Sequence, residues 1–451
     1  MIRRRDFLSL TACSALAAGC RTSTSARAVR RDKPNVLVIL ADDLGYGDLS
    51  CYGAADIRTP HIDALMKAGK RFTRFRSNCC VCAPTRAALL TGRYPEFVGV
   101  PGVIRTFDKQ NWGALLPGCL MLPELFRANG WTTTLVGKWH LGLEEGSLPN
   151  ERGFARFRGF LGDMMDDYWT HLRHGVNYMR KDRETIAPEG HATDLFTRWA
   201  QAEIVRADEM DEPLFLYLAY NAPHAPIQPP EEWLARAKKR LGNTASEQRV
   251  RMAAFVEHLD AGVGCVLQTL KERGLERDTL VVFSSDNGGD LRYGSSNGAW
   301  RSGKTHMYEG GVTVPASFTW EGTIAPGLVE QDMATMDVLP TVMDLLGLKI
   351  PAGLDGQSFA QVLAGGMPVA AERPVFHMWR EGFTTEALRY GDWKLVRDRD
   401  NLPWELYNLR DDPGETKDLA SVNPDKLHEL RRVMDAHMAR ACAVPWTRPV
   451  K

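Results

Sequence analysis

Residues 35–41 read N-V-L-V-I-L-A and are followed at once by Asp42 and Asp43. A continuous apolar run of this length predicts a strand that is buried on both faces, which is typical of a parallel sheet. Two similar runs, Pro213 to Tyr220 and Thr279 to Ser284, are again followed by polar residues. We therefore expect several parallel strands within one buried sheet.

Residues 250–270, between the second and third runs, carry apolar side chains at intervals of three and four, such as Met252, Val256, Leu259 and Val263. This spacing marks one face of a helix. Buried strands that alternate with amphipathic helices indicate an α/β protein with a large, doubly wound, mostly parallel sheet. Ligands of such sheets bind beyond the carboxyl ends of the strands, so the polar residues after each run are candidates for chemistry.

The sequence changes character after about Gly365. Short apolar stretches separated by glycine or charged turns predict a small antiparallel sheet, which a helix over 424–439 follows. We therefore expect a signal segment at 1–32, a main domain at 33–365, and a smaller C-terminal antiparallel-sheet domain at 366–451. The expected C-terminal strands are 375–379, 385–390, 393–396 and 404–409.

The charges of the chain balance, with 56 Lys plus Arg against 56 Asp plus Glu. Nucleic-acid binders usually carry a basic excess, and a net charge of zero provides no overall field that would steer such a partner. We therefore expect no nucleic-acid partner, and any electrostatic function must be local. The hydrophobic content of 44% is that of an ordinary globular protein.

The N-terminus has the three parts of a signal peptide: basic residues at 3–5, an apolar stretch at 7–18, and small residues before Cys20. The apolar part is shorter than the roughly 20 residues that a membrane-spanning helix needs. Its start, R-R-D-F-L, resembles a twin-arginine export signal. The stretch L-A-A-G-C resembles a lipobox, with cleavage after Ala28 as the alternative. We expect an exported protein that is periplasmic or anchored through a lipid on Cys20.

The cysteine count bears on the fate of the thiols. There are 9 Cys, and Cys13 and Cys20 belong to the signal segment, so 9 − 2 leaves seven. An odd count in an exported protein suggests that one Cys has a fate other than a disulfide. Reduced, buried cysteines are the alternative.

Polar side chains follow two of the predicted strands. Asp42 and Asp43 come after the first run, and Asp286 and Asn287 after the third. If these strands are neighbours, three carboxylates and an amide meet at one sheet edge, and such hard oxygen ligands suit Ca²⁺ or Mg²⁺ better than zinc. The alternative is that acids at strand ends simply cap turns or helices.

Residues 79–95 read C-C-V-C-A-P-T-R-A-A-L-L-T-G-R-Y-P. Pro84 fits the first turn of a helix that ends at Gly92, which places Cys82 at the positive end of that helix. A zinc cluster of the three cysteines would need a second group of Cys or His at ligand spacing. A thiolate nucleophile at Cys82 would need a His base and matches a hard cation poorly, so an oxygen nucleophile suits the site better.

The stretch from Cys82 to Gly92, which begins C-A-P-T-R, resembles the signature of the formylglycine-dependent, arylsulfatase-like sulfatases of the alkaline phosphatase superfamily. In that family the Cys is oxidised after synthesis to formylglycine. Thr85 stands where the family most often has Ser, and because Thr keeps the hydroxyl we expect maturation to be retained. The resemblance identifies 33–365 as the catalytic domain. Further matching motifs are D-D-L-G-Y-G-D at 42–48, G-K-W-H-L-G at 137–142, A-P-H-A-P at 222–226, S-D-N-G at 285–288, G-K at 303–304 and Y-E-G-G at 308–311.

The resemblance implies one divalent cation per chain, usually Ca²⁺. Three carboxylates beside an anionic substrate would repel it by about 4 kcal/mol per charge pair at 4 Å, for an effective dielectric constant near 20, so the site needs cations. We expect the charges to separate into an acidic cluster that holds the metal and a basic cluster that holds the sulfate. The implied metal ligands are Asp42, Asp43, Asp286, Asn287 and the modified Cys82, and the implied catalytic residues are Cys82, Arg86, Lys138, His140, His224 and Lys304.

The implied activity is hydrolysis of sulfate monoesters, with a sulfated saccharide or an aryl sulfate as substrate and a formylglycine-maturing enzyme as partner. In the family mechanism a hydroxyl of the hydrated aldehyde attacks sulfur. His224, helped by Lys304, protonates the leaving alcohol, and His140 takes the proton whose loss expels sulfate.

Three other functions fit parts of the same pattern. A related hydrolase of phosphodiesters or phosphonate monoesters can share the formylglycine signature. An alkaline-phosphatase-like monoesterase would need His ligands beside Asp42 and Asp286, which the sequence does not place there. A non-catalytic glycan-binding relative would have lost catalytic residues, whereas every expected position is filled here.

The sequence also predicts the surroundings or the role of several single residues. Lys138 and Lys304 lie beside glycines, so we expect both in loops from which the side chain turns inward. Residues 163–178, rich in His and aromatic side chains, form a candidate specificity loop, with an ordinary solvated loop as the alternative. We expect Trp139, Trp393, Asp260 and Asp337 to be structural, and Trp300 to be a candidate substrate contact.

Overall fold

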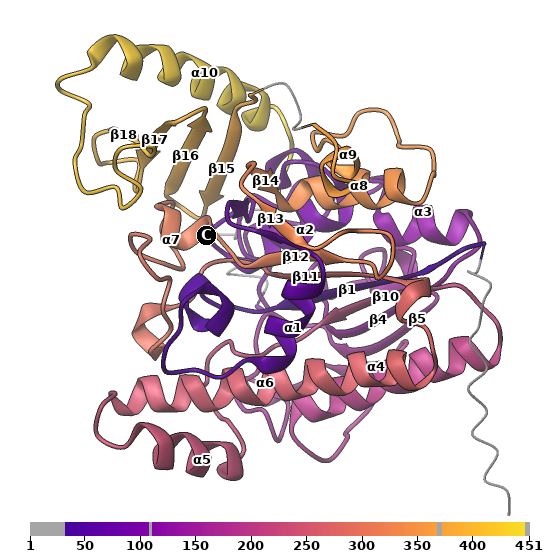
Figure 1. Cartoon of the computed structure of the whole chain (residues 1–451). Coiled ribbons are helices and arrows are strands. Elements are labelled where there is room, and N and C mark those ends of the chain that lie inside the picture. Colours follow the sequence, from indigo (N-terminus) through magenta and orange to yellow (C-terminus); the bar gives the residue numbers. More distant parts are fainter. Residues whose placement is uncertain (1–31, 108–110, 368–371, 447–451) are drawn as a thin grey trace, which may run out of the picture.

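The computed structural model describes residues 32–107, 111–367 and 372–446. The predicted twin-arginine and lipobox patterns, with Cys20, lie outside these residues. A ten-stranded sheet forms the centre of the molecule (Figure 1). In spatial order its strands are β13 (Gly327–Val329), β2 (Lys70–Phe72), β12 (Ala316–Thr319), β11 (Thr279–Ser285), β1 (Asn35–Ala41), β10 (Leu214–Ala219), β4 (Thr132–Lys138), β5 (Arg156–Phe160), β8 (Met179–Lys181) and β9 (Glu184–Thr185).

The centre of this sheet is parallel. Strand β1 pairs in parallel with β11 on one side and β10 on the other, and β10, β4 and β5 continue in the same direction. Antiparallel pairings flank this centre, where β12 joins β11 and β8 joins β5. The sheet is therefore mixed, and the three apolar runs of the sequence form β1, β10 and β11 within its parallel part.

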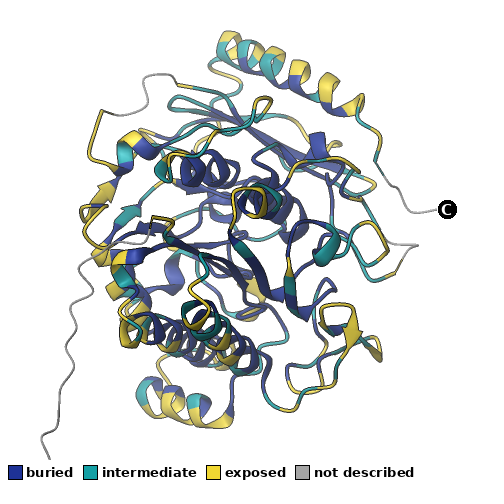
Figure 2. Ribbon diagram, turned by 90° about the vertical axis from the view of Figure 1, so that its right-hand side faces the viewer, coloured by how far each residue is buried: buried dark blue, intermediate teal, exposed yellow. Residues whose placement is uncertain are grey.

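Both faces of the sheet are covered by helices. Leu37 and Ile39 of β1 pack in one hydrophobic core, whereas Val36 and Val38 pack in a second core on the opposite face. Figure 2 shows the strands between the helices in dark blue, because both of their faces are buried. The first core is covered by α1 (Pro60–Ala68), α4 (Ala192–Glu209), α5 (Glu231–Leu241) and α6 (Glu247–Glu272), and the second by α2 (Cys82–Thr91), α3 (Leu122–Ala128), α8 (Val338–Leu345) and α9 (Ala360–Leu363).

A separate four-stranded antiparallel sheet follows near the C-terminus, with helix α10 (Pro424–Cys442) packed on it (Figure 1). Leu430 and Met434 of α10 share a core with Leu388, Leu395 and Leu406 of the sheet. Its strands are β15 (Val375–Arg380), β16 (Thr384–Tyr390), β17 (Trp393–Arg397) and β18 (Glu405–Asn408). The remaining short elements are β3 (Phe75–Arg76), β6 (Leu172–Arg173), β7 (Val176–Asn177), α7 (Glu309–Val312) and β14 (Met333–Ala334).

The thiols give a simple answer to the odd cysteine count. All seven cysteines from Cys51 to Cys442 are free, and Cys79, Cys80 and Cys82 are buried. In the described part of the chain the cysteines are therefore reduced rather than paired in disulfides. The odd count by itself does not single out one of them. Within the same residues, no helix combines the length and the apolar character required to cross a bilayer.

Candidate active site

The acidic residues meet because β1 and β11 are parallel neighbours in register. Ala41 lies opposite Ser285, so the next residues, Asp42 and Asp286, leave the sheet side by side. The backbone N–H of Asp43 donates to Asp286 Oδ1 at 3.1 Å, and Asn287 Nδ2 donates to Asp43 Oδ1 at 2.8 Å. All four side chains are buried, which agrees with the expectation that they share one sheet edge.

The backbone around the site contains conformations that the sequence did not indicate. Asp43 and His140 adopt left-handed backbone angles, with φ of 63° and 61°. Such angles are uncommon for residues other than glycine and concentrate at functional sites. Gly137 has φ of 106°, and a Cβ there would lie 1.9 Å from the carbonyl oxygen of Ala219. Only glycine allows this close approach of β4 to β10, and it sets the position of the next residue, Lys138.

Helix α2 carries the candidate nucleophile. Val81 is extended, the helix begins at Cys82, and Gly92 ends it in the left-handed conformation as its N–H binds the carbonyl of Ala88. Burial raises the pKa of the Cys82 thiol to about 11. The thiol is therefore neutral at pH 7, which argues against the unmodified thiolate nucleophile. Thr85 keeps its hydroxyl hydrogen-bonded to the backbone of Cys79.

The cysteine cluster does not form a zinc site. The possible metal-binding groups among the described residues place Cys82 with Asp42 and Asp286, and they include neither Cys79 nor Cys80. Cys79 Sγ instead lies 3.2 Å from the carbonyl oxygen of Met378. Cys82 thus belongs with the carboxylates rather than with its neighbouring cysteines.

The basic residues pair with the acids one by one. Arg86 contacts Asp286 Oδ2 through Nε at 3.1 Å and Nη2 at 2.7 Å. Lys138 Nζ lies 2.6 Å from Asp42 Oδ2, and Lys304 Nζ lies 2.6 Å from Asp43 Oδ2. The acidic and the basic side chains are therefore interleaved as ion pairs in the structure, and the assignment of the metal to the acids and of the sulfate to the bases stays a prediction. Buried charges need close partners of opposite sign, and each of these carboxylates finds one.

The position of Lys138 also differs from the expectation. It is the last residue of β4, not a loop residue, and it is fully buried. Lys304 does lie in a loop and its side chain turns inward. The side chain of Lys138 reaches the site because β4 ends at the same edge of the sheet as β10 and β1.

The charges shift the acidity of the buried groups in opposite directions. Although burial opposes it, Lys138 and the other nearby cations hold the pKa of Asp42 well below its usual value. Burial, and then the negative charge of Asp42, raise the pKa of Asp286 to about 7. Although burial also opposes it, the carboxylate of Asp43 holds the pKa of Lys304 well above its usual value. A divalent cation beside Asp286 would favour its ionised form.

The oxygen atoms of the site fit a hard cation. Asp42 Oδ1 and Asn287 Oδ1 are buried and have no hydrogen-bond partner among the described residues. The ligand atoms of Asp42, Cys82 and Asp286 lie within 4.8 Å of one another, as do those of Asp42, Asp43 and His224. Buried acceptors without donors and closely spaced carboxylates are what Ca²⁺ or Mg²⁺ requires.

His224 lies nearer to the acids than the sequence indicated. It follows β10, and its Nε2 lies 3.5 Å from Asp43 Oδ2. The sequence placed no His ligand beside Asp42 and Asp286, and the structure brings His224 into one group with Asp42 and Asp43. His224 Nδ1 donates to the carbonyl of Ala225 at 2.6 Å, which leaves Nε2 facing the site. Burial lowers the pKa of His224.

His140 is held by a hydrogen bond through the other ring nitrogen. Its Nε2 donates to the carbonyl of Ile104 at 2.8 Å, and its Nδ1 has no partner among the described residues. Burial lowers the pKa of His140 well below its ordinary value. The ring is therefore neutral at pH 7, with a lone pair on Nδ1 that can accept a proton.

Tyr168 supports the active site in a way that the sequence did not predict. It lies in the candidate specificity loop, yet it is buried, and its hydroxyl lies 2.7 Å from the carbonyl of Asn221 and 2.9 Å from that of His224. Tyr168 thus fixes the turn that carries His224. No local signal could have revealed this contact, because the two residues are far apart in the sequence.

The other expectations meet mixed outcomes. Trp139 is fully buried and its Nε1 donates to the carbonyl of Ser147, so it packs as expected. Trp300 lies edge-on to Tyr46, with ring centroids 5.9 Å apart, and its substrate contact stays a prediction. Structural roles are confirmed for Asp260, which accepts the backbone N–H groups of His61 and Ile62, and for Asp337, which accepts those of Ala334 and Gln357.

Comparison with known proteins adds independent evidence. Residues 34–348 match the family model described as Sulfatase, and residues 299–442 match one described as "N-sulphoglucosamine sulphohydrolase, C-terminal". The chain is 34% identical to arylsulfatase A of Homo sapiens, over 89% of this chain and 87% of that protein. It is 31% identical to N-acetylgalactosamine-6-sulfatase of Rattus norvegicus, over 88% and 78% of the two chains.

A solved structure agrees with these relatives. The crystal structure of Ps i-CgsB in complex with k-i-k-neocarrahexaose superposes with a TM-score of 0.84 at 31% identity, and the match covers 92% of this chain and 95% of that one. The family model alone spans more than half of the chain. The protein therefore belongs to the sulfatase family of sulfuric ester hydrolases.

Proposed function

We propose that this protein hydrolyses sulfate monoesters of a saccharide, using a formylglycine made from Cys82 and one bound Ca²⁺. One observation carries the proposal: Cys82 begins a buried helix within ligand distance of Asp42 and Asp286, at a site with three cationic side chains. The similarity to a structure that holds a carrageenan oligosaccharide supports a saccharide as substrate. An aryl sulfate would serve as a small substitute substrate.

The metal would be held by hard oxygen ligands. Asp42, Asp43 and Asp286 supply carboxylates, and Asn287 supplies its free Oδ1. When present, the cation provides Lewis acidity toward sulfate oxygens, and formylglycine at position 82 provides an oxygen nucleophile. The carboxylates supply the negative charge that Ca²⁺ requires.

Lys138 and Lys304 would bind the sulfate. Both contact carboxylates of the site through Nζ, and Lys304 keeps its proton because Asp43 raises its pKa. Fixed positive charges in a buried site stabilise negative charge that develops on sulfate oxygens without any cost of reorganising water. Arg86 binds Asp286 through two nitrogens, donates to the carbonyl of Lys138 through Nη1 and lies 3.6 Å from Asp42 Oδ1, so we assign it to positioning these carboxylates.

The two histidines would transfer protons in opposite directions, with His224 as the donor and His140 as the acceptor. His224 Nε2 and Lys304 Nζ both approach Asp43 Oδ2, at 3.5 and 2.6 Å, so a proton held by the lysine is close to the imidazole that faces the leaving alcohol. His140 Nδ1 carries a free lone pair and would accept a proton. Neutral imidazoles suit such proton transfers near pH 7.

The proposal includes a location and a maturation partner. The N-terminal pattern supports export through the twin-arginine pathway, to the periplasm or to a lipid anchor on Cys20. Because that pathway carries folded proteins, and Cys82 is buried in the fold, the maturing enzyme would have to oxidise Cys82 in the cytoplasm before folding is complete.

Paired assays on the sulfate ester and the phosphodiester of one aryl alcohol test the reaction class. We expect faster hydrolysis of the sulfate, and faster hydrolysis of the phosphodiester would favour the related phosphodiesterase. Cys82→Ser should lower kcat by roughly 10⁶-fold, as the loss of a covalent nucleophile does. Cys265→Ser, at an exposed cysteine, is the matched control and should retain activity. Peptide mass spectrometry should find the aldehyde at position 82 of the wild type, and full activity without it would contradict the proposal.

A further inference from the structure

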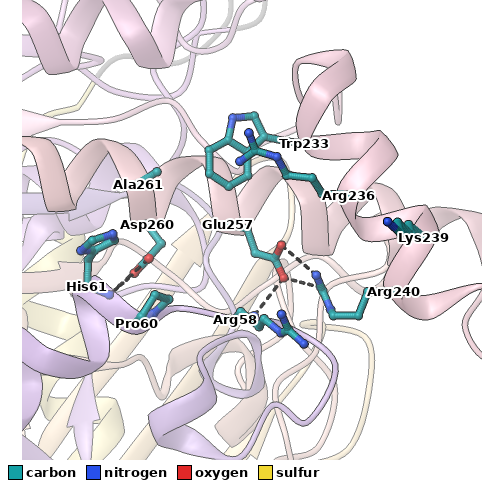
Figure 3. A pocket seen from close by; sticks show the side chains of 10 residues that line it. All are labelled: Arg58, Pro60, His61, Trp233, Arg236, Lys239, Arg240, Glu257, Asp260 and Ala261. Carbon is teal, nitrogen blue, oxygen red and sulfur yellow. Dashed lines mark hydrogen bonds and ion pairs between the residues drawn. The ribbon is translucent and has the colours of Figure 1, made fainter.

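A pocket lies away from the active site, between α5, α6 and the start of α1 (Figure 3). Its volume is about 530 Å³, and none of the candidate catalytic or metal-binding residues lines it. This volume falls within the range of about 300–1,000 Å³ that is usual for sites of small ligands. Figure 1 shows α5 and α6 on the side of the main sheet that faces away from the C-terminal sheet.

The acids of this pocket are already committed to partners. The carboxylate of Glu257 binds the guanidinium of Arg240 and the backbone N–H of Arg58, as the dashed lines in Figure 3 show. Asp260 accepts the backbone N–H groups of His61 and Ile62, and burial raises its pKa to about 7. Neither carboxylate is therefore free to neutralise a further cation.

The remaining cations give the pocket a positive excess. The side chains of Arg58 and Lys239 are exposed and have no hydrogen bond or ion pair among the described residues, although both line the pocket. Arg236 pairs with Glu232 at 3.0 Å, but both side chains are more than half exposed, so this pair is worth little. An anionic group that enters the pocket would meet uncompensated positive charge.

The pocket also offers an apolar surface beside these charges. Trp233, Pro60 and Ala261 line it, and the Trp233 ring is partly exposed. The guanidinium of Arg236 lies over the Trp233 ring, 4.7 Å from its centroid, and the ring of buried His258 lies 5.7 Å from that centroid, so Trp233 holds this cation at the pocket. The exposed part of the Trp233 ring, with Pro60 and Ala261, provides apolar contact for a sugar, and the neighbouring cations suit a sulfate on that sugar.

We propose that this pocket is a second binding site for a sulfated saccharide chain, separate from the catalytic site. The identification of the anion as sulfate rests on the proposed function, whereas the affinity for an anionic saccharide rests on the pocket itself. A polymeric substrate bound here would be kept at the enzyme surface while the catalytic site acts on another of its sugars, which raises the local concentration of sulfate esters.

The double variant Arg58→Ala/Lys239→Ala tests the proposal on the full chain. Native electrophoresis through gels that contain dextran sulfate, with uncharged dextran as the reference, measures retention by a sulfated polymer. We expect the dissociation constant to rise about tenfold, because two exposed ion pairs with sulfate groups of the polymer are lost. The kcat/KM for a small aryl sulfate should stay within twofold of the wild-type value, because neither residue contacts the active site.

Lys238→Ala/Lys271→Ala is the matched control. It removes the same charge from exposed positions on α5 and α6 that do not line the pocket. Equal losses of retention in the two double variants would overturn the proposal, because they would indicate attraction by general surface charge. Unchanged retention of Arg58→Ala/Lys239→Ala would also overturn it.

The experiments can contradict the proposed catalytic function and the proposed binding site independently of each other. If the protein hydrolyses no aryl sulfate but its retention by dextran sulfate still depends on Arg58 and Lys239, the proposed catalytic function is wrong and the binding site stands. If aryl sulfate is hydrolysed and retention is insensitive to both residues, the binding site is wrong and the catalytic function stands. The thermal midpoints of all variants should match that of the wild type, since none of these side chains forms a buried contact.

Discussion

Two buried ion-pair clusters of similar composition lie in different parts of this molecule. The active-centre cluster consists of Asp42, Asp43, Asp286, Arg86, Lys138 and Lys304. The interface cluster consists of Arg76, Glu309, Lys394 and Glu415, and it joins the region of α7 to β17 of the C-terminal sheet. In the latter, Lys394 Nζ lies 2.9 Å from Glu309 Oε1 and 2.9 Å from Glu415 Oε1.

The clusters differ in which atoms are left without a hydrogen bond. In the active-centre cluster and its neighbours these are acceptors, Asp42 Oδ1, Asn287 Oδ1 and His140 Nδ1. In the interface cluster the donors Nε and Nη1 of Arg76 are left, together with one acceptor, Glu415 Oε1. That oxygen already faces a cation, because Lys394 Nζ lies 2.9 Å from it and bridges two carboxylates. Buried charge alone therefore does not identify a catalytic site. A surplus of acceptors at the carboxyl ends of parallel strands does, because it leaves room for a cation.

The largest expected effect on stability comes from Lys394→Ala in the interface cluster. Loss of this ammonium leaves Glu309 and Glu415 without their shared cation and should lower the free energy of unfolding by about 3–5 kcal/mol. Urea denaturation measures the change, and Lys417→Ala, at an exposed position, is the control. The kcat of the folded enzyme should be retained, and a large loss of kcat would show that the interface cluster is not purely structural.

Lys138→Ala tests the other side of the comparison. This residue is buried against Asp42, and its removal should lower kcat by about 10²–10³-fold, or ~2.7–4 kcal/mol in activation free energy, as the loss of one charge-stabilising donor does. Steady-state kinetics with an aryl sulfate give the value. If Lys138→Ala and Lys394→Ala reduced kcat equally in folded protein, the distinction between the two clusters would fail.

Removal of the metal should affect the stability provided by the active-centre cluster and not that provided by the interface cluster. A chelator should lower the stability of the wild type by about 2.7 kcal/mol, the value for a ligand present at 100 times its Kd, and added Ca²⁺ should restore it. Asn287→Ala lacks the free Oδ1 and should show a smaller response, whereas Glu309→Gln should respond like the wild type. Thermal unfolding with and without Ca²⁺ provides the measurement, and an unchanged response in Asn287→Ala would remove this residue from the ligand set.

The smallest expected effect concerns pH. Burial, and then Lys394, lower the pKa of His377 beside the interface cluster to about 3, against about 6.5 in an unfolded chain. Between these two pH values His377 is protonated in the unfolded chain and neutral in the folded chain. The free energy of unfolding therefore falls as the pH drops, by at most about 1.4 kcal/mol per pH unit. His377→Gln should flatten this slope between pH 6.5 and pH 4.5 in urea denaturation. An equal slope in the variant would mean that other groups cause the acid sensitivity.

Much of the fold could be predicted because its signals are local. The apolar runs became β1, β10 and β11, and the stretch after Cys82 became helix α2 with Gly92 at its end. Lys138 was misplaced because a glycine beside a lysine suggests a loop, whereas Gly137 here permits the close contact of two strands. The pairing of each acid with a basic residue was missed because it depends on side chains from separate parts of the chain.

The sequence alone determined the order of buried strands and amphipathic helices, the candidate nucleophile, and the identity of the charged residues around it. These follow from periodicity and from motifs that are short enough to be read in one stretch. Only the tertiary structure decided that Tyr168 supports His224, that Arg76, Glu309, Lys394 and Glu415 form a second buried cluster, and that Arg58 and Lys239 line one basic pocket with Trp233. Such contacts join residues that are distant in the chain, so they arise only once the strands have paired and the helices have packed.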